Sequence, residues 1–228
     1  MKQSALKLEL PTLMGIEDFF ISSSNEQAYS AIDCFWYKEF FAFNIYGKEG
    51  CGKTHLVNIF KDKYNALVIS AKNVNMKNYD TFFYKNSILA IEDIDENIDC
   101  EAMFHLYNVY KNEGGYILFT SKKPLNQIIT PIKDLNSRFG AVAVAEIKAP
   151  DDILLNALIV KLAYDKGINI NPDVISFILK RAERSFLFIT KLINELDLLS
   201  LERQKAITVP MAKEVINFFE DNLQQELF

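Results

Sequence analysis

The stretch FAFNIYGKEGCGKTHLVNIFKDKY, residues 41–64, decides the fold of this chain. A short apolar run, typical of a buried strand, leads into a glycine-rich turn and then into a helical pattern of apolar residues. The turn, residues 47–54, satisfies GxxxxGK[ST]. Glycines in such a turn let consecutive backbone N–H groups surround phosphate oxygens, and the helix that follows adds its positive end. A chance glycine-rich turn is the alternative, but the strand and helix on either side favour a P-loop.

A P-loop gives individual residues a chemical role. Lys53 would reach the β and γ phosphates of a nucleotide, and Thr54 would be a ligand of Mg²⁺. The predicted nucleotide-binding positions of this segment, including the first residue after the motif, are Gly47, Gly50, Cys51, Gly52, Lys53, Thr54 and His55. Neither His55 nor His105, the only histidines, has a metal-binding partner at useful spacing.

Four further apolar runs predict strands, at 66–71, 87–93, 116–121 and 141–147, with a helix at 99–112. Continuous apolar runs are typical of strands that are buried on both faces of a parallel sheet. After Pro150 the strand patterns stop, and helical patterns follow at 151–166, 172–182, 186–203 and, in a short fourth, 210–223. We therefore predict an extended arm, an α/β nucleotide-binding domain and a helical domain, with boundaries at 1–16, 17–150 and 151–228.

Acidic residues end the strand predicted at 87–93. The carboxylates of Glu92 and Asp93 occupy the place where a Walker B strand holds Mg²⁺ and the attacking water. Such acids are often solvated strand ends, but the P-loop earlier in the same pattern favours catalytic and metal-binding roles. Two registers remain open, because either Glu92 or Asp93 could face the metal. Both predict poor intrinsic hydrolysis, since the next residue would be a short aspartate or the apolar Ile94 in place of a well-placed base.

Three more polar residues are candidates on weaker grounds. Thr120 and Ser121 close the strand at 116–121 and would lie beside the phosphates if that strand neighbours the one at 87–93. Hydroxyl residues after a strand are more often turn formers. Arg138 lies in LNSRFG, which we predict to be a loop between a short helix and the last strand. Its guanidinium could reach a phosphate across a subunit interface, although a solvated arginine is the simpler interpretation.

Composition excludes several classes of protein. The chain has 228 residues, of which 50% are hydrophobic, so it is long enough to bury a sizeable core. Its net charge of −5 argues against a broad DNA-binding surface. The three cysteines, Cys34, Cys51 and Cys100, are widely spaced and are expected to be free thiols. No signal peptide or membrane-spanning run is apparent, so we expect a cytoplasmic protein without membrane contact.

Several of these segments, in this order, resemble the DnaA family of AAA+ proteins, and within it the regulatory Hda proteins. The similar segments are DFFISSSNEQAY (18–29), GKTHL (52–56), FHLYNVYKNEGGYILFTSKKPLNQI (104–128) and DLNSRFG (134–140). The resemblance implies an α/β AAA+ module with a helical lid that binds ADP or ATP with Mg²⁺. It places Phe20 and Asn25 in the adenine-side pocket and Thr120 and Ser121 in the sensor-1 region. It also makes Arg138 the arginine finger, which overturns the simpler interpretation.

The resemblance also implies partners. The chain ends after the lid, without a segment similar to the C-terminal DNA reader of DnaA, and this favours an Hda-type regulator that does not bind a specific DNA sequence. Such a regulator promotes ATP hydrolysis by DnaA together with the DNA polymerase sliding clamp. The arm ALKLELP (5–11) resembles a degenerate clamp-binding peptide in which Ala5 replaces the usual glutamine. A homo-oligomer is a further expectation.

Two departures from the family pattern bear on activity. No arginine stands near Leu187 and Phe188, where the lid's sensor 2 would align, and Arg184 lies about one turn earlier. Lys122 replaces an acid that is common after the sensor-1 strand. These departures favour a nucleotide-bound regulator. The alternative is an AAA+ ATPase that remodels or loads another replication protein, and turnover by the isolated chain would separate the two.

Overall fold

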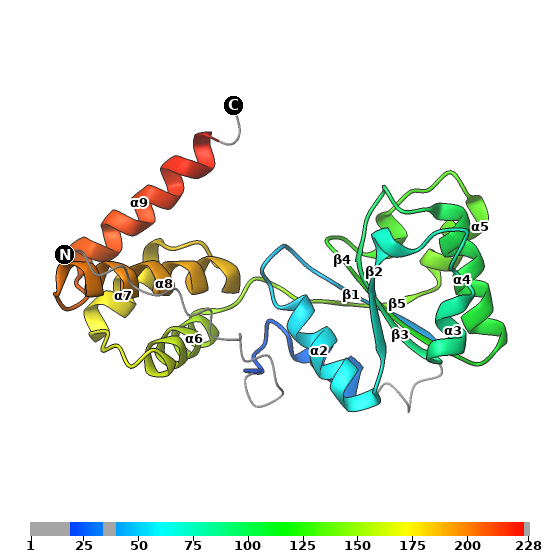
Figure 1. Cartoon of the computed structure of the whole chain (residues 1–228), viewed down its shortest axis with the longest axis horizontal. Helices are drawn as coiled ribbons and strands as arrows, with labels where there is room; N and C mark the ends of the chain where they lie inside the picture. Colours follow the sequence, from blue (N-terminus) through cyan, green and yellow to red (C-terminus); the bar gives the residue numbers. More distant parts are fainter. Residues whose placement is uncertain (1–18, 34–39, 226–228) are drawn as a thin grey trace, which may run out of the picture.

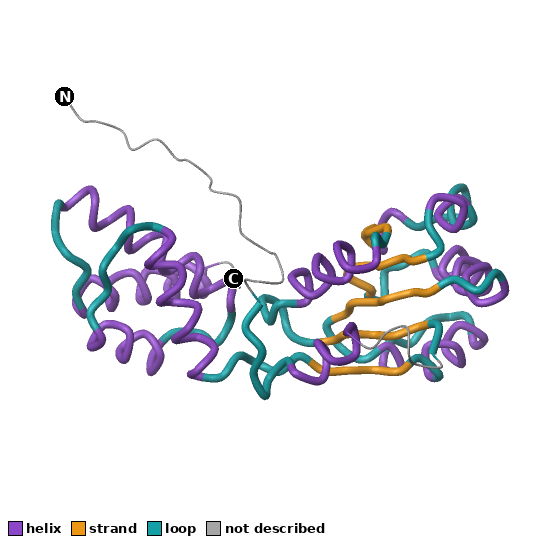
Figure 2. The backbone as a smooth tube through the Cα atoms, turned by 90° about the horizontal axis from the view of Figure 1, so that it is seen from below, coloured by secondary structure: helices purple, strands orange, loops and turns teal. Residues whose placement is uncertain are grey.

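The computed structural model describes residues 19–33 and 40–225 of the chain. The arm predicted at 1–16 and Cys34 lie outside these residues. In the described part, all strands lie in one half of the molecule and the other half contains helices only (Figure 2). The predicted α/β class with a helical lid is therefore confirmed.

The first half is built on a five-stranded parallel sheet with the order β2-β3-β4-β1-β5. Its strands follow the predicted apolar runs closely: β1 (Ala42–Tyr46), β2 (Leu67–Ser70), β3 (Ile88–Ile94), β4 (Tyr116–Ser121) and β5 (Ala143–Glu146). The strand β4 lies between β1 and β3, so the ends of the P-loop strand and of the acidic strand flank the end of β4.

Helices cover both faces of the sheet because successive residues of each strand point to opposite sides. In β3, Leu89 and Ile91 pack with α4 (Cys100–Asn112), whereas Ala90 packs with α2 (Lys53–Tyr64). Figure 1 shows α2 on one side of the sheet and α3, α4 and α5 on the other. The remaining helices of this half are α1 (Glu26–Asp33), α3 (Thr81–Lys85) and α5 (Lys133–Gly140), with short 3-10 turns η3 (Ala71–Asn73) and η4 (Leu125–Gln127).

The second half has its own apolar core, built around Ile159, Ile178 and Ile193. Its helices are α6 (Asp152–Asp165), α7 (Pro172–Arg181), α8 (Phe186–Arg203) and α9 (Val209–Gln225). The last of these has 17 residues, so the short fourth helix that we predicted is in fact a long one. Its apolar side chains continue the core of this half, which explains the length.

A buried amide joins three parts of the sheet domain. Asn44, in the middle of β1, is fully buried. Its Nδ2 donates to the Phe119 carbonyl oxygen at 3.3 Å and to Ser121 Oγ at 2.9 Å. Its Oδ1 accepts from the Leu125 backbone N–H at 3.1 Å. One side chain thus holds the end of β4 and the start of η4 against β1.

Replacing this amide should destabilise the fold. In Asn44→Leu, the Leu125 N–H would remain buried without its acceptor, so we expect a loss of about 2 kcal/mol or more in the free energy of unfolding. Urea unfolding measures it. Asn194→Leu, at an exposed position of α8, is the control and should change stability by less than about 0.5 kcal/mol. Equal effects of the two substitutions would contradict the role of the Asn44 amide.

Candidate functional site

The P-loop joins β1 to α2 and requires glycine at three positions. Gly50 and Gly52 have φ angles of 71° and 104°, in the left-handed region that side chains disfavour. A Cβ on Gly47 would lie 2.4 Å from the Ile147 carbonyl oxygen. The loop therefore keeps a shape that presents backbone N–H groups at the start of α2, as an anion-binding turn needs.

Lys53 is held inside this loop. Its side chain is buried, and Nζ donates to the carbonyl oxygens of Gly47 at 2.8 Å and Lys48 at 2.9 Å. Cys51 Sγ lies 3.9 Å from the same ammonium. Burial raises the pKa of the Cys51 thiol, so this cysteine is a neutral packing group in the loop. The loop thus keeps one positive charge at the mouth of the predicted phosphate site.

Thr54 and Glu92 meet across the site. The Thr54 hydroxyl donates a hydrogen bond to the Glu92 carboxylate, which joins the start of α2 to the end of β3. Burial raises the pKa of Glu92, with a contribution from Asp93, while the Thr54 hydrogen bond and Lys53 act in the opposite direction. A hydroxyl and a carboxylate in contact are suitable Mg²⁺ ligands. Of the two registers left open by the sequence, the geometry favours the one in which Glu92 faces the P-loop.

Asp93 has a different environment because β3 is irregular at this point. The pairing of β3 with β4 shifts between Ile91 and Ile94, and Asp93 has a φ of 61°. Its backbone N–H donates to Thr120 Oγ1 at 3.1 Å, and its side chain is exposed. The two acids therefore do not form one cluster at the P-loop.

The hydroxyls of β4 hold the strand ends in place. Thr120 accepts the Asp93 N–H, and both Thr120 and Ser121 are buried. Ser121 Oγ donates to the Lys123 carbonyl oxygen at 2.6 Å and accepts from Asn44. The structure places β4 next to the acidic strand, which is the condition under which we expected these residues near the phosphates, and it gives their hydroxyls partners within the protein.

The predicted adenine-side segment packs on the first turn of α2. Phe19 stacks on Tyr29 with ring centres 5.7 Å apart and meets the His55 ring edge-on at 5.1 Å. Phe20 is 39% exposed, and its carbonyl oxygen accepts from the buried Asn25 side chain at 2.9 Å. These residues form a wall beside the P-loop helix.

The amide of Asn25 closes a turn. Its Oδ1 accepts the Ser22 backbone N–H at 2.9 Å, which lies before α1 in the chain. An asparagine that immediately precedes a helix, as Asn25 precedes α1, commonly caps it. The side chain instead bonds backward, because the turn at Ser22–Asn25 brings the preceding N–H within reach.

The lid contacts the P-loop directly. The Phe186 backbone N–H, at the start of α8, donates to the Gly50 carbonyl oxygen at 2.9 Å. A Cβ on Gly50 would lie 3.1 Å from the Cβ atoms of both Ser185 and Leu187. Arg184, the nearest arginine to the expected sensor-2 position, pairs with Asp152 at 2.6 Å. The lid therefore meets the loop through one backbone hydrogen bond and through the close approach of Ser185 and Leu187 to Gly50.

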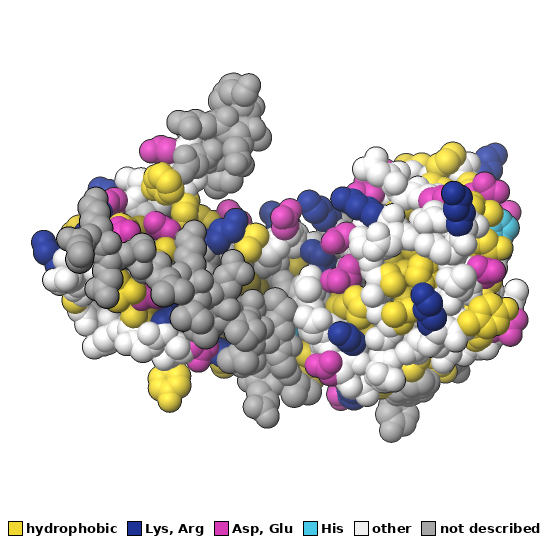
Figure 3. All heavy atoms as spheres, viewed as in Figure 1, with side chains coloured by type: hydrophobic (Ala, Val, Ile, Leu, Met, Phe, Trp, Pro, Cys, Tyr) yellow, Lys and Arg dark blue, Asp and Glu magenta, His cyan; other side chains and the backbone are white. Residues whose placement is uncertain are grey.

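Charged side chains surround the mouth of the site. Lys122, after β4, pairs with Glu49 of the P-loop at 3.0 Å, and both are exposed. The Glu49 carboxyl has a lowered pKa, first because of its hydrogen bond from Lys122 and to a smaller extent because of Lys53 and Lys191. The face drawn in Figure 3 shows basic and acidic side chains intermixed near the junction of the two halves.

Arg138 lies on α5, in its last turn, and not on the loop that we predicted. Its Nε donates to Asn108 Oδ1 at 2.8 Å, and Nη1 donates to the Asp134 carbonyl oxygen at 3.2 Å. The guanidinium carbon is 4.5 Å from the centre of the Phe104 ring. The bond to Asp134 is possible because residues 134–138 are helical, which places the Asp134 carbonyl oxygen one turn before Arg138. The helix α5, which carries Arg138, and the P-loop helix α2 lie on opposite sides of the sheet (Figure 1).

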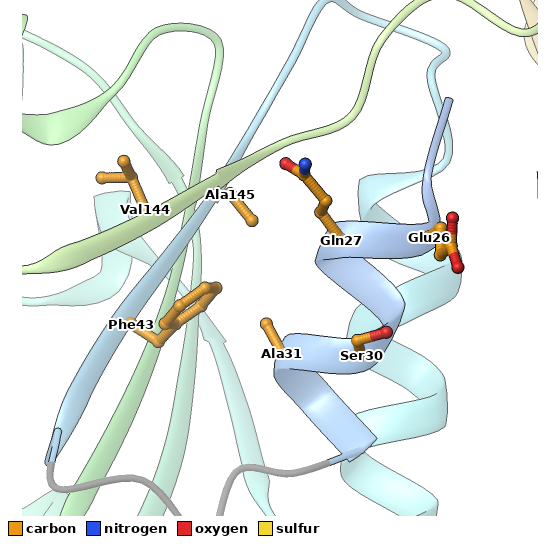
Figure 4. Close-up of a pocket in the computed structure, with 7 residues that line it drawn as sticks. All are labelled: Glu26, Gln27, Ser30, Ala31, Phe43, Val144 and Ala145. Atoms are coloured by element: carbon orange, nitrogen blue, oxygen red, sulfur yellow. The ribbon is translucent and has the colours of Figure 1, made fainter. Parts of the chain in front are cut away.

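Figure 4 shows a pocket that is separate from the P-loop. It is an open hollow between α1, β1 and the edge strand β5, with Phe43, Ala145 and Ala31 at its base and Gln27 at its rim. None of the predicted site residues lines it. It therefore has no part in the predicted nucleotide site.

Sequence reasoning missed two kinds of residue. Asn44 had a visible signal, because a lone polar residue interrupts the apolar run FAFNIY. Asn108 and Phe104 had none, because a contact between α4 and α5 depends on how the two helices pack. These residues orient the predicted site residues Ser121 and Arg138.

Comparison with known proteins identifies the relatives of this arrangement. The family described as "Hda, lid domain" matches residues 151–216. The chromosomal replication initiator protein DnaA of Aliarcobacter butzleri is 27% identical over 220 residues, covering 86% of this chain and 50% of that protein. The chain is therefore similar to DnaA over most of its length and to the Hda lid over residues 151–216.

Solved structures share the fold of this chain. Domain III of DnaA from Thermotoga maritima superposes with a TM-score of 0.77 and 19% identity, covering 90% of this chain and 96% of that one. AMPPCP-bound DnaA from Aquifex aeolicus has a TM-score of 0.71 and 18% identity, with coverage of 92% and 70%. The chain spans about half the length of the DnaA relatives that it matches. In the described residues, no helix has the length and apolar character needed to cross a membrane.

The environment of Glu92 predicts a pH dependence of stability. Because its folded-state pKa is raised, the folded protein binds this proton more readily than the unfolded chain. Stability should therefore fall as pH rises from the unfolded value of about 4.3 through the raised folded pKa. Glu92→Gln should remove this fall. The free energy of unfolding of the variant should therefore increase relative to that of the wild type as the pH rises between the unfolded and the folded pKa. Urea unfolding at stepped pH tests it, and a constant difference between the two proteins would contradict the assignment.

Proposed function

We propose that this chain binds an adenine nucleotide at its P-loop and promotes ATP hydrolysis by DnaA by presenting Arg138 to the partner's nucleotide. The observation that carries the proposal is the placement of Arg138. This residue belongs to α5, which lies on the side of the sheet opposite to the P-loop helix, so its guanidinium would act on the nucleotide of another subunit. Arginines that act in this way neutralise charge that develops on a transferring phosphoryl group.

The P-loop residues fit a nucleotide. Gly47 is packed too closely for a side chain, the positive φ angles of Gly50 and Gly52 shape the turn, and Lys53 fixes a positive charge there. Thr54 and Glu92 would hold Mg²⁺, and Phe20 and Asn25 would lie on the adenine side. Bound ATP or ADP with Mg²⁺ would supply a negatively charged polyphosphate between the P-loop and Glu92. The similarity to AMPPCP-bound DnaA supports this part of the proposal.

Slow intrinsic hydrolysis is part of the same proposal. Asp93, the acid that follows Glu92, has an exposed side chain and a backbone N–H bonded to Thr120. Lys122 pairs with Glu49, so the position after the sensor-1 strand carries a cation. A general base must lie within hydrogen-bond reach of its water, and Asp93 is displaced by the bulge in β3. The chain would then act mainly as a regulator of replication initiation.

DnaA is the proposed partner because the resemblance to Hda implies it, and the chain matches both the Hda lid family and DnaA. We further propose that the sliding clamp takes part through residues 5–11, which lie outside the described residues. A homo-oligomer built through the same Arg138 surface is the competing assembly. Both assemblies would bring this arginine to a nucleotide held by another subunit.

Removing the P-loop ammonium should abolish nucleotide binding. In Lys53→Ala, the loop loses its buried positive charge, so we expect calorimetry with ADP and with ATP to show no measurable binding. Lys61→Ala, at an exposed position of the same helix, is the matched control and should bind as the wild type does. Unchanged affinity in Lys53→Ala would remove the P-loop assignment.

Removing the Arg138 guanidinium should abolish stimulation of DnaA while leaving nucleotide binding by this chain unchanged. The loss should be on the order of a thousandfold or more in the rate of partner hydrolysis, because the charge acts only in the transition state. The measurement is single-turnover hydrolysis of ATP preloaded on DnaA, with clamp and DNA present. Arg181→Ala, an exposed arginine of α7, is the control. Retained stimulation by folded Arg138→Ala would contradict the role of the arginine.

A further inference from the structure

One face of α4 holds the Arg138 side chain. Asn108 contributes the acceptor for Nε at 2.8 Å, and Phe104, one helical turn earlier, places its ring 4.5 Å from the guanidinium carbon. The Asp134 carbonyl oxygen, from α5 itself, accepts from Nη1. Two helices thus fix the orientation of a side chain that would otherwise have several rotatable bonds.

The Phe104 ring is itself supported. It meets the His105 ring edge-on at 5.4 Å, and His105 packs against Tyr79 at 5.3 Å. Aromatic contacts of this kind stabilise a fixed ring position, and a cation over a ring face is attracted by its quadrupole. The stack therefore gives Arg138 a rigid base that extends from α4 to the segment before α3.

The partners of Arg138 are electrically neutral. Its described contacts are an amide oxygen, a backbone carbonyl oxygen and a ring, and no ion pair with a described carboxylate is present. Arg184 and Arg203 differ, because each pairs with a carboxylate, on Asp152 and Glu214 respectively. Of the five N–H groups of a guanidinium, only two of Arg138's have acceptors among the described residues. The full charge and three donors stay available.

We infer that Asn108 is a positioning residue for Arg138, one that fixes the guanidinium without neutralising it. This inference rests on the proposed function for its consequence in catalysis, although the positioning itself is a property of this chain alone. An aspartate at 108 would have the same size and a stronger bond to Nε, but its charge would cancel the charge that Arg138 offers to a phosphate. An amide at position 108 therefore fixes the orientation of the Arg138 guanidinium and leaves its positive charge unpaired.

Two substitutions separate these properties. Asn108→Leu removes the acceptor and should release the side chain, whereas Asn108→Asp should keep the bond and remove the net charge. Displacement of a catalytic group by about 1 Å costs on the order of a hundredfold, and we expect Asn108→Leu to lower stimulation of DnaA to that extent. For Asn108→Asp, we expect the loss of stimulation to lie between about tenfold and the roughly thousandfold loss expected for Arg138→Ala. Asn112→Asp, exposed at the end of the same helix, is the control for an added charge.

The experiment uses two readouts on the full chain. Nuclear magnetic resonance of the Arg138 Nε–H group reports its hydrogen bond, and single-turnover hydrolysis on DnaA reports its effect. We expect a distinct, protected Nε–H signal in the wild type and in Asn108→Asp, and an averaged signal in Asn108→Leu. In an Arg138→Ala background, neither substitution at 108 should lower stimulation further, because Asn108 acts only through that arginine.

The outcomes test separately the positioning role of Asn108, the need for a neutral acceptor and the proposed function. An unchanged Nε–H signal in folded Asn108→Leu would overturn the positioning role. Full stimulation by Asn108→Asp with the signal retained would overturn the requirement for a neutral acceptor, as would equal losses from Asn108→Asp and Asn112→Asp. If Arg138→Ala itself kept full stimulation, the proposed function would fail, while the resonance measurement would still decide whether Asn108 positions the arginine.

Discussion

The buried amide of Asn44 is the interaction on which the predicted nucleotide site depends. It binds the end of β4 through Phe119 and Ser121, and it also accepts the N–H that begins η4. With β4 fixed, Thr120 can accept the Asp93 N–H, and β3 can end with Glu92 toward Thr54. A polar side chain in the middle of a fully buried strand is costly unless every bond is made. Those bonds hold the end of β4 and the start of η4 against β1.

Lys53 and Arg138 are held in different ways, the first by its own loop and the second by two helices. Lys53 is buried against carbonyl oxygens of its own loop, where its charge is close to the place expected for phosphate. Arg138 is half-buried and is held by neutral groups of α4 and α5, two helices on the other side of the sheet. The first arrangement suits binding of a nucleotide by this chain, and the second suits contact with a nucleotide held elsewhere. Under the proposed function, one small domain would present two separate charges, each to a different nucleotide.

The sequence was sufficient for the fold because its signals are local. The apolar runs at 66–71 and 116–121 and the glycines of the P-loop depend only on neighbours in the chain, and the structure has strands and a loop there. The environment of Asp93 was not predictable, because the bulge arises from the pairing of β3 with β4. Arg138 was placed on a loop for a similar reason. The helix α5 has only eight residues, and its Arg138 side chain bonds to Asn108 of α4, a contact that no local pattern shows.

The contact between Gly50 and the lid joins segments that are far apart in the chain. A side chain at position 50 would press on Ser185 and Leu187, each with its Cβ 3.1 Å from the added Cβ, and the Gly50 carbonyl oxygen is bonded to Phe186. During evolution these positions are not independent, since a larger residue in the loop requires a different helix start in the lid. The identity of the lid thus restricts which P-loop variants the protein can sample, and an exchange of lids between relatives would have to carry the matching loop with it.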